Sequence, residues 1–265
     1  MSKLCGLTIA LAGCGTVAKL PDAGTDPDAG HDVPEVCNGR DDNNSGIVDE
    51  GCPREGPVVL TAGVSSPLYG ATTTANTTNT IFTLDCPPGT AVTGFYGRAY
   101  ESVDAIGLRC GVPMLRIVDT QASAYAYALT IAPASDVAVQ GGSGGTAFEA
   151  TCWGDAMVGS LRFWTGSNAN GTSIYGFAYD CSGAITITGS PGAFTVVVGS
   201  TTPSDRIGTG DGSITETLEQ FGCPSGSVVT GVTGYYGPWP PYPSFITVNG
   251  LSVRCAAITA QLISV

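Results

Sequence analysis

Charged side chains are scarce in this chain of 265 residues, at 12% of the total, which is about half the usual share. Their balance is one-sided, because 22 acidic residues stand against 10 basic ones and the formal net charge is −12. Lysine is nearly absent, since Lys3 and Lys19 are the only two. This charge argues against nucleic acid and anionic lipid as partners.

Histidine is scarcer still, because His31 is the only one and lies in a segment that reads as a linker. Ser-His-Asp and Cys-His catalysis and histidine-ligated metals are therefore excluded from the rest of the chain. The absence of any CxxC pair disfavours zinc and iron–sulfur sites. A carboxylate pair for glycoside cleavage stays open, but nothing points to one. We expect no enzyme, and only scattered surface carboxylates among Asp104, Glu149, Asp155 and Asp180.

No stretch of the sequence has sustained helical periodicity. From residue 57 on, short runs rich in Val, Ile, Thr and aromatic residues alternate with clusters of Gly, Ser, Pro and Asn. Examples are Ile81–Leu84, Ala184–Thr188 and Phe194–Val198. Residues 57–265 are therefore predicted to be all-β.

Cysteine is present in number, with ten residues. Eight of them fall into four sequential pairs: Cys37/Cys52, Cys86/Cys110, Cys152/Cys181 and Cys223/Cys255. Pairs separated by short loops are typical of disulfides in an oxidising compartment.

The N-terminus has the layout of a secretory signal. Met1–Lys3 is positively charged, and Leu4–Gly13 is apolar but too short to span a bilayer. Leu11-Ala12-Gly13-Cys14 resembles a bacterial lipobox. The resemblance implies a signal peptide over 1–13, a lipid on Cys14, and a partner membrane reached through that lipid. The lack of Asp after Cys14 implies the outer membrane or cell surface, and the alternative is a buried apolar strand with a chance cysteine.

Residues 14–34 read as an extended linker. Pro21-Asp22-Ala23-Gly24 recurs as Pro27-Asp28-Ala29-Gly30. Few apolar residues, together with prolines and repeated carboxylates, predict a stalk rather than a folded element.

Three repeats follow one another within 57–265, each bounded by one cysteine pair. A valine stands six residues after each first cysteine, at Val92, Val158 and Val229. Alternating apolar triplets end on each second cysteine: Ile106/Leu108/Cys110, Phe177/Tyr179/Cys181 and Leu251/Val253/Cys255. Period-two alternation places these side chains inward and Arg109, Asp180 and Arg254 outward. We predict that each repeat is closed by its own disulfide.

The first repeat resembles jacalin-like lectins over Cys86-Pro87-Pro88-Gly89, Gly94-Phe95-Tyr96-Gly97-Arg98 and Val103-Asp104-Ala105-Ile106-Gly107-Leu108. The resemblance implies a β-prism of three antiparallel sheets, and the alternative architecture is a β-trefoil. The short sugar-binding loop of those lectins is not evident. We therefore expect a shared fold rather than a shared site.

Residues 35–54 form a separate acidic module, which resembles the metal-binding motif of MopE-type bacterial surface proteins over Cys37-Asn38-Gly39-Arg40-Asp41-Asp42 and Asp49-Glu50-Gly51-Cys52. Read as a calcium loop, its ligands are Asp41, Asn43, Ser45, the Ile47 carbonyl and Asp49, with Glu50 nearest to the missing last carboxylate. Oxygen ligands favour weakly bound Ca²⁺ over copper. The alternative is a disulfide-bridged hairpin without an ion. We expect the module to be independent of the β domain.

An aromatic insertion, Tyr235–Pro243, distinguishes the third repeat. Its candidate ligand-binding residues are Tyr236, Trp239 and Tyr242, with Trp164 of the second repeat as a weaker candidate. The alternative is a cap that buries Trp239. These features predict a lipid-anchored surface protein with a carbohydrate-binding domain and a glycan partner. The alternative is a structural or adhesive protein that binds an envelope protein without sugar specificity.

Overall fold

The computed structural model describes residues 35–42, 44–74, 77–119, 126–168, 171–182, 185–190, 193–199, 202–210, 212–239 and 242–261. The predicted signal peptide, Cys14, the linker and Asn43 lie outside the described residues. None of the described residues form a helix long and apolar enough to cross a membrane.

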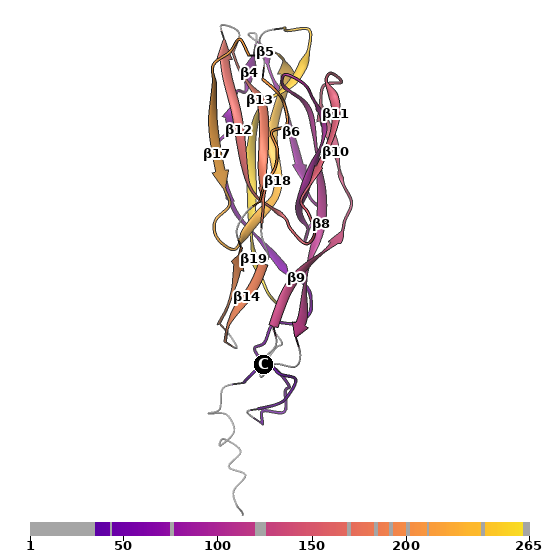
Figure 1. Cartoon of the computed structure of the whole chain (residues 1–265), viewed down its shortest axis with the longest axis vertical. Coiled ribbons are helices and arrows are strands. Elements are labelled where there is room, and N and C mark those ends of the chain that lie inside the picture. Colours follow the sequence, from indigo (N-terminus) through magenta and orange to yellow (C-terminus); the bar gives the residue numbers. More distant parts are fainter. Residues whose placement is uncertain are drawn as a thin grey trace, which may run out of the picture.

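The described chain is all-β and forms three antiparallel sheets arranged as a β-prism, as predicted (Figure 1). The first sheet contains β1 (Gly56–Pro57), β7 (Ala91–Ala99), β8 (Val103–Asp119), β9 (Ala126–Pro133), β10 (Val137–Gly141), β11 (Thr146–Thr151), β14 (Ile185–Ser190) and β15 (Ala193–Val198). The second contains β4 (Thr73–Thr74), β5 (Thr77–Thr78), β12 (Val158–Asn168), β13 (Gly171–Cys181), β16 (Thr202–Pro203) and β17 (Glu216–Gly222). The third contains β2 (Val59–Ser65), β3 (Tyr69–Gly70), β6 (Thr80–Asp85), β18 (Ser227–Pro238) and β19 (Ile246–Thr259).

Each sheet is built around the long hairpin of one repeat and also contains a strand from a different repeat. The hairpins are β7–β8, β12–β13 and β18–β19. The strand before each first cysteine pairs with the hairpin of a different repeat: β11 with β7, β17 with β12, and β6 with β18. The repeats are therefore interlocked around the prism axis.

The four disulfides join the pairs that the sequence predicts, with Cα–Cα distances of 5.6–5.7 Å. The strand exchange changes what three of them do in space. Cys86 follows β6 of the third sheet and is bonded to Cys110 in β8 of the first. Cys152–Cys181 joins the first sheet to the second in the same way, and Cys223–Cys255 joins the second to the third. The three bridges therefore close a ring of sheets, rather than single repeats in isolation.

The main core of the prism contains every side chain predicted to point inward. Val92, Val158 and Val229 have no exposed surface. The other members from the repeats are Ile106, Leu108, Cys110, Phe177, Tyr179, Cys181, Leu251, Val253 and Cys255. Asp180 is not the surface carboxylate that the sequence suggested, because it is only 8% exposed although its neighbours Tyr179 and Cys181 are the ones in the main core. It lies on β13 beside the paired strand β16 and is compensated by Arg162 and by the Ser160 hydroxyl.

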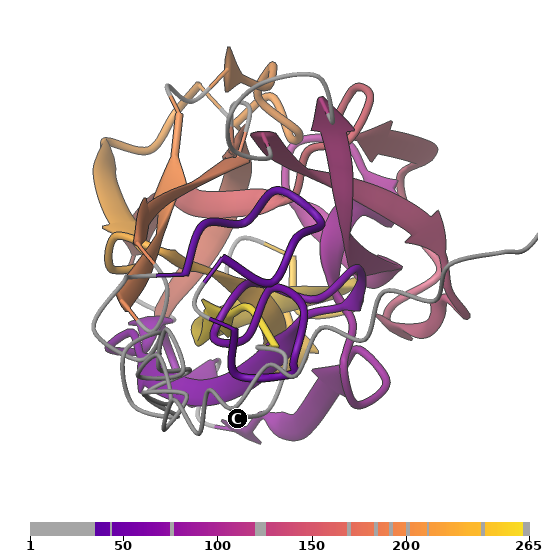
Figure 2. The same ribbon diagram turned by 90° about the horizontal axis from the view of Figure 1, so that it is seen from below.

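A second cluster, the base core, lies at the end of the prism that carries the acidic module (Figure 1). Its members are Cys37, Cys52, Val58, Ala91, Leu115, Tyr127, Leu129, Met157, Ile185, Ile187, Val228 and Ile258. The sequence suggested that the acidic module is independent of the β domain, but the structure packs the two together. Figure 2 shows its indigo segment lying across the centre of the base. The module is too short to form a core of its own, and its disulfide is its main apolar group. Cys52 is completely buried because residues of the β domain pack against it.

Candidate functional site

The candidate site is a pocket at the tip of the prism, at the opposite end from the acidic module. It has a volume of about 260 Å³. The lining residues come from three connections far apart in the sequence: Tyr100, Glu101, Ser102 and Asp104; Gly144 and Gly145; and Trp239, Tyr242 and Phe245.

Asp104 supplies the pocket with a buried carboxylate at the start of β8. The residue is 6% exposed, and its Oδ2 atom forms no hydrogen bond with any described residue. Burial raises the pKa of Asp104 from 3.8 to about 6, although the nearby Arg98 guanidinium acts in the opposite direction. The pocket thus contains a desolvated acceptor without a partner in the described chain.

Two glycines allow the loop between β10 and β11 to approach this carboxylate. A Cβ atom at Gly144 would lie 2.5 Å from Oδ1 of Asp104, and one at Gly145 would lie 2.4 Å from Oδ2. Arg98 holds the loop, because Nε donates to the Gly144 carbonyl and Nη2 to the Gly145 carbonyl, both at 2.6 Å. No larger residue fits at either position without displacing the carboxylate.

The aromatic insertion forms the opposite wall. It folds on itself, since the Trp239 amide donates to the Phe245 carbonyl at 2.7 Å and the Phe245 amide donates to the Tyr242 carbonyl at 2.9 Å. Trp239 is 6% exposed and packs on Tyr175, with ring centroids 6.2 Å apart. Its indole Nε1 is buried and has no acceptor among the described residues. Tyr242 and Phe245 continue outward and are 56% and 54% exposed.

Two of the four predicted ligand-binding aromatics therefore lie in this pocket. The two interpretations of the insertion, a ligand-binding surface and a cap that buries Trp239, each describe part of it. Trp239 acts as a cap, while Tyr242 presents its ring to solvent. Tyr236 packs against Phe82 beside the main core, with ring centroids 6.0 Å apart. Trp164 is covered by Arg206, whose guanidinium carbon lies 4.6 Å from the ring centroid.

Sequence reasoning missed the other half of the pocket, Asp104 and the glycine loop. One signal was available, because Gly141-Gly142-Ser143-Gly144-Gly145 is a glycine run between two strand-like segments. Its pairing with Asp104 was not visible in the sequence.

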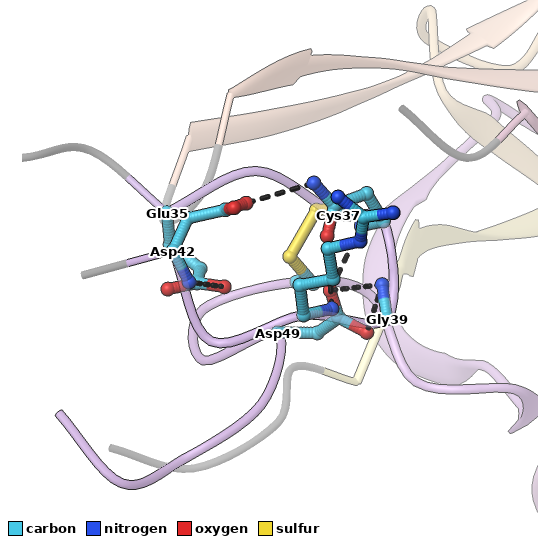
Figure 3. Close-up of a disulfide and its surroundings, with 8 residues drawn as sticks. Glu35, Cys37, Gly39, Asp42 and Asp49 are labelled. Carbon is cyan, nitrogen blue, oxygen red and sulfur yellow. Dashed lines mark hydrogen bonds between the residues drawn. A yellow bond between two sulfur atoms is a disulfide. The ribbon is translucent and has the colours of Figure 1, made fainter. Parts of the chain in front are cut away.

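The acidic module uses its carboxylates to hold its own backbone (Figure 3). Asp41 accepts hydrogen bonds from the amides of Ser45 and Gly46, at 3.0 and 2.8 Å. Asp49, which is 7% exposed, accepts from the amides of Asn38 and Gly39, each at 2.9 Å.

This arrangement does not fit the proposed calcium loop well. In the part of the chain that the structure describes, no three His, Cys, Asp or Glu side chains are grouped so that they could hold a metal ion. Ser45 and Ile47 instead contact each other, because the Ile47 amide donates to the Ser45 hydroxyl at 3.1 Å. Calcium binding stays a prediction, with Asp49 and Asp41 acting as backbone caps.

No family model and no curated protein matches this chain. It is similar in structure to the biofilm matrix protein Bap1 of V. cholerae, at 16% identity and a TM-score of 0.43, covering 76% of this chain and 25% of that one. It is also similar to AcmJRL, a mannose-binding jacalin-related lectin from Ananas comosus, at 13% identity and a TM-score of 0.43, covering 76% and 99% of the two chains. The second β-prism domain of V. cholerae RbmC, bound to N-acetylglucosaminyl-β-1,2-mannose, gives 16% identity and a TM-score of 0.35, covering 72% and 98%.

Proposed function

We propose that this protein is a glycan-binding protein of the cell surface and that the tip pocket holds a terminal sugar ring. The observation that supports this most is a matched pair of unused polar atoms. The Asp104 Oδ2 acceptor and the Trp239 Nε1 donor are both buried, have no partner among the described residues, and line the same small pocket.

A sugar has the chemistry to satisfy both atoms. Each hydroxyl can donate to a carboxylate and accept from an indole N–H, and buried polar groups otherwise carry a desolvation cost. The exposed rings of Tyr242 and Phe245 offer flat apolar surfaces to the C–H face of a pyranose. A volume of about 260 Å³ is at the small end for ligand pockets, which favours one ring over a longer segment.

The geometry of the whole molecule agrees with display at a surface. The N-terminal module packs on the base of the prism, and the pocket lies at the tip (Figure 1). A lipid on Cys14, linked through residues 15–34, would therefore tether the base and present the pocket outward. Four disulfides support an oxidising compartment.

A glycan array with the purified protein tests the proposal. We expect signal on a group of glycans that share a terminal residue, and at least about tenfold weaker binding for Asp104→Asn and Tyr242→Ala. Leu218→Ala is the matched control, because Leu218 is 56% exposed, like Tyr242, and does not line the pocket.

The alternative function is a structural or adhesive role in which the domain binds another envelope protein. An empty array, together with capture of a single envelope protein in a way that Tyr242→Ala abolishes, would establish that alternative. Release of reducing sugar from a bound glycan would instead show that the protein is an enzyme.

A further inference from the structure

A second and larger hollow, here called the seam groove, lies where the first and second sheets meet beside the Cys152–Cys181 disulfide. Its volume is about 920 Å³. It opens where β14 leaves β9, since those strands are paired only through Thr186 and Ala128. It shares no lining residue with the tip pocket.

Trp153 stands in this groove and is 91% exposed. Burial in the core does not explain its position, because such a ring gains almost nothing from folding. The chain on both sides of Trp153 is nevertheless anchored. The preceding Cys152 is disulfide-bonded, and its amide donates to the Thr93 carbonyl at 2.8 Å. On the other side, Asp155 accepts a hydrogen bond from the Ile131 amide at 2.8 Å.

The lining of the groove is rich in hydroxyl and carboxylate groups. It includes Thr151, Thr202 and Asp205, together with Ser182 and Ser204, whose hydroxyls already accept from the Met157 and Tyr179 amides. Among the described residues that line the groove there is no Lys or Arg. Glu149 at its edge is already paired with Arg109, at 2.9 Å. The lining therefore offers hydrogen-bond acceptors and small donors, and its remaining charge is negative, which favours a neutral ligand over an anionic one.

We propose that the seam groove is a second binding site, which takes a stretch of neutral polysaccharide with one sugar ring stacked on Trp153. A flat aromatic surface on an anchored segment, beside hydroxyl and carboxylate acceptors, matches a polyhydroxylated chain that has one apolar ring face. The open groove is much larger than the tip pocket, so it accommodates several linked rings. This assignment does not depend on the tip pocket binding a sugar.

Tryptophan fluorescence reports on this site selectively. The chain has three tryptophans. Trp239 is buried and Trp164 is covered by Arg206, so acrylamide quenching acts mainly on Trp153. The probes are soluble neutral hexasaccharides of glucose, mannose, xylose and N-acetylglucosamine, added to the folded full-length protein.

We expect at least one hexasaccharide to reduce the quenching constant by about half or more, in wild type and in Tyr242→Ala alike. Calorimetry should show at least about tenfold weaker binding of that hexasaccharide to Trp153→Ala, with partial recovery in Trp153→Phe. The melting temperature of Trp153→Ala should stay unchanged, because the ring is exposed.

Three results would overturn the assignment: no protection of Trp153 by any of the hexasaccharides, protection by a peptide that adds to the edge of β11 instead, or hexasaccharide binding that Tyr242→Ala abolishes and Trp153→Ala leaves intact. The last result would place the sugar at the tip and leave the proposed function standing.

Discussion

At the scale of single residues, the tip pocket depends on a carboxylate kept in an unfavourable environment. Asp104 is buried against a glycine loop, and its Oδ2 atom has no described partner. Part of the desolvation cost is offset by the positive charge of Arg98, which the Gly144 and Gly145 carbonyls hold beside the carboxylate, and by a backbone hydrogen bond. Because its pKa differs between the folded and unfolded states, the burial of Asp104 can be measured from the pH dependence of stability.

The raised pKa of Asp104 predicts how stability changes with pH. Between pH 3.8 and about 6 the folded protein holds this proton more tightly than the unfolded chain does. The carboxyl therefore favours the folded state below that window and loses this contribution as pH rises through it, by at most about 3 kcal/mol. Asp104→Asn should gain stability relative to wild type from pH 4 to pH 7 in urea titrations. Parallel pH profiles for the two proteins would contradict the burial of this group.

Gly145 provides a second test at this scale. It has φ +61°, and a Cβ atom there would collide with Asp104. Gly154 has the same φ with nothing within 4 Å, so it is a matched control. Both alanine substitutions carry a conformational cost of about 1–2 kcal/mol. Gly145→Ala should cost more in chemical denaturation and should also weaken glycan binding, whereas Gly154→Ala should leave tip binding unchanged. Equal effects of the two would show that the glycine loop does not shape the pocket.

At the scale of elements, the acidic module covers the base of the prism and completes its base core. Its Cys37–Cys52 bridge is part of the base core, and Asp49 fixes the turn that starts at Asn38. The carboxylates that a calcium loop would use accept hydrogen bonds from backbone amides. A bound calcium ion would therefore compete with these amides for the same carboxylates.

Calorimetric titration of the whole protein separates the two roles. We expect calcium binding no tighter than about 10⁻⁴ M, which Asp41→Ala removes. Asp49→Ala should lower the melting temperature even in EDTA, because it leaves the amides of Asn38 and Gly39 without their acceptor. An Asp49→Ala protein that melts like wild type in EDTA would show that this carboxylate is not structural.

At the scale of the whole molecule, the prism is held as a ring. The chain-entropy model gives about 3–4 kcal/mol for each bridge that closes a loop of this length. We expect the double serine variants of Cys86/Cys110, Cys152/Cys181 and Cys223/Cys255 to lose stability by this amount in guanidinium titrations. Peptide mapping of the oxidised protein should recover the same three pairs. A cross-linked peptide that pairs any of these six cysteines with a different partner would refute the ring.

The proposed lipid anchor also belongs to the scale of the whole molecule. Globomycin treatment of the producing cells should accumulate a precursor, and Cys14→Ser should leave the membrane fraction. Lipidated protein that persists in the membrane fraction of Cys14→Ser would exclude Cys14 as the attachment site. With a net charge of −12, electrostatic attraction to anionic lipid is not expected to substitute for it.

The sequence by itself determined the strand faces and the cysteine pairs. Val92, Val158 and Val229 and the apolar triplets are all buried, because inward orientation follows from alternation within a few residues. Asp180 was misjudged, since its burial depends on β16 and Arg162, which alternation does not show. Only the tertiary structure decided the strand exchange, the docking of the module and the tip pocket. The pocket joins residues near 104, 145 and 242, and such contacts are set by how the repeats interlock rather than by local pattern.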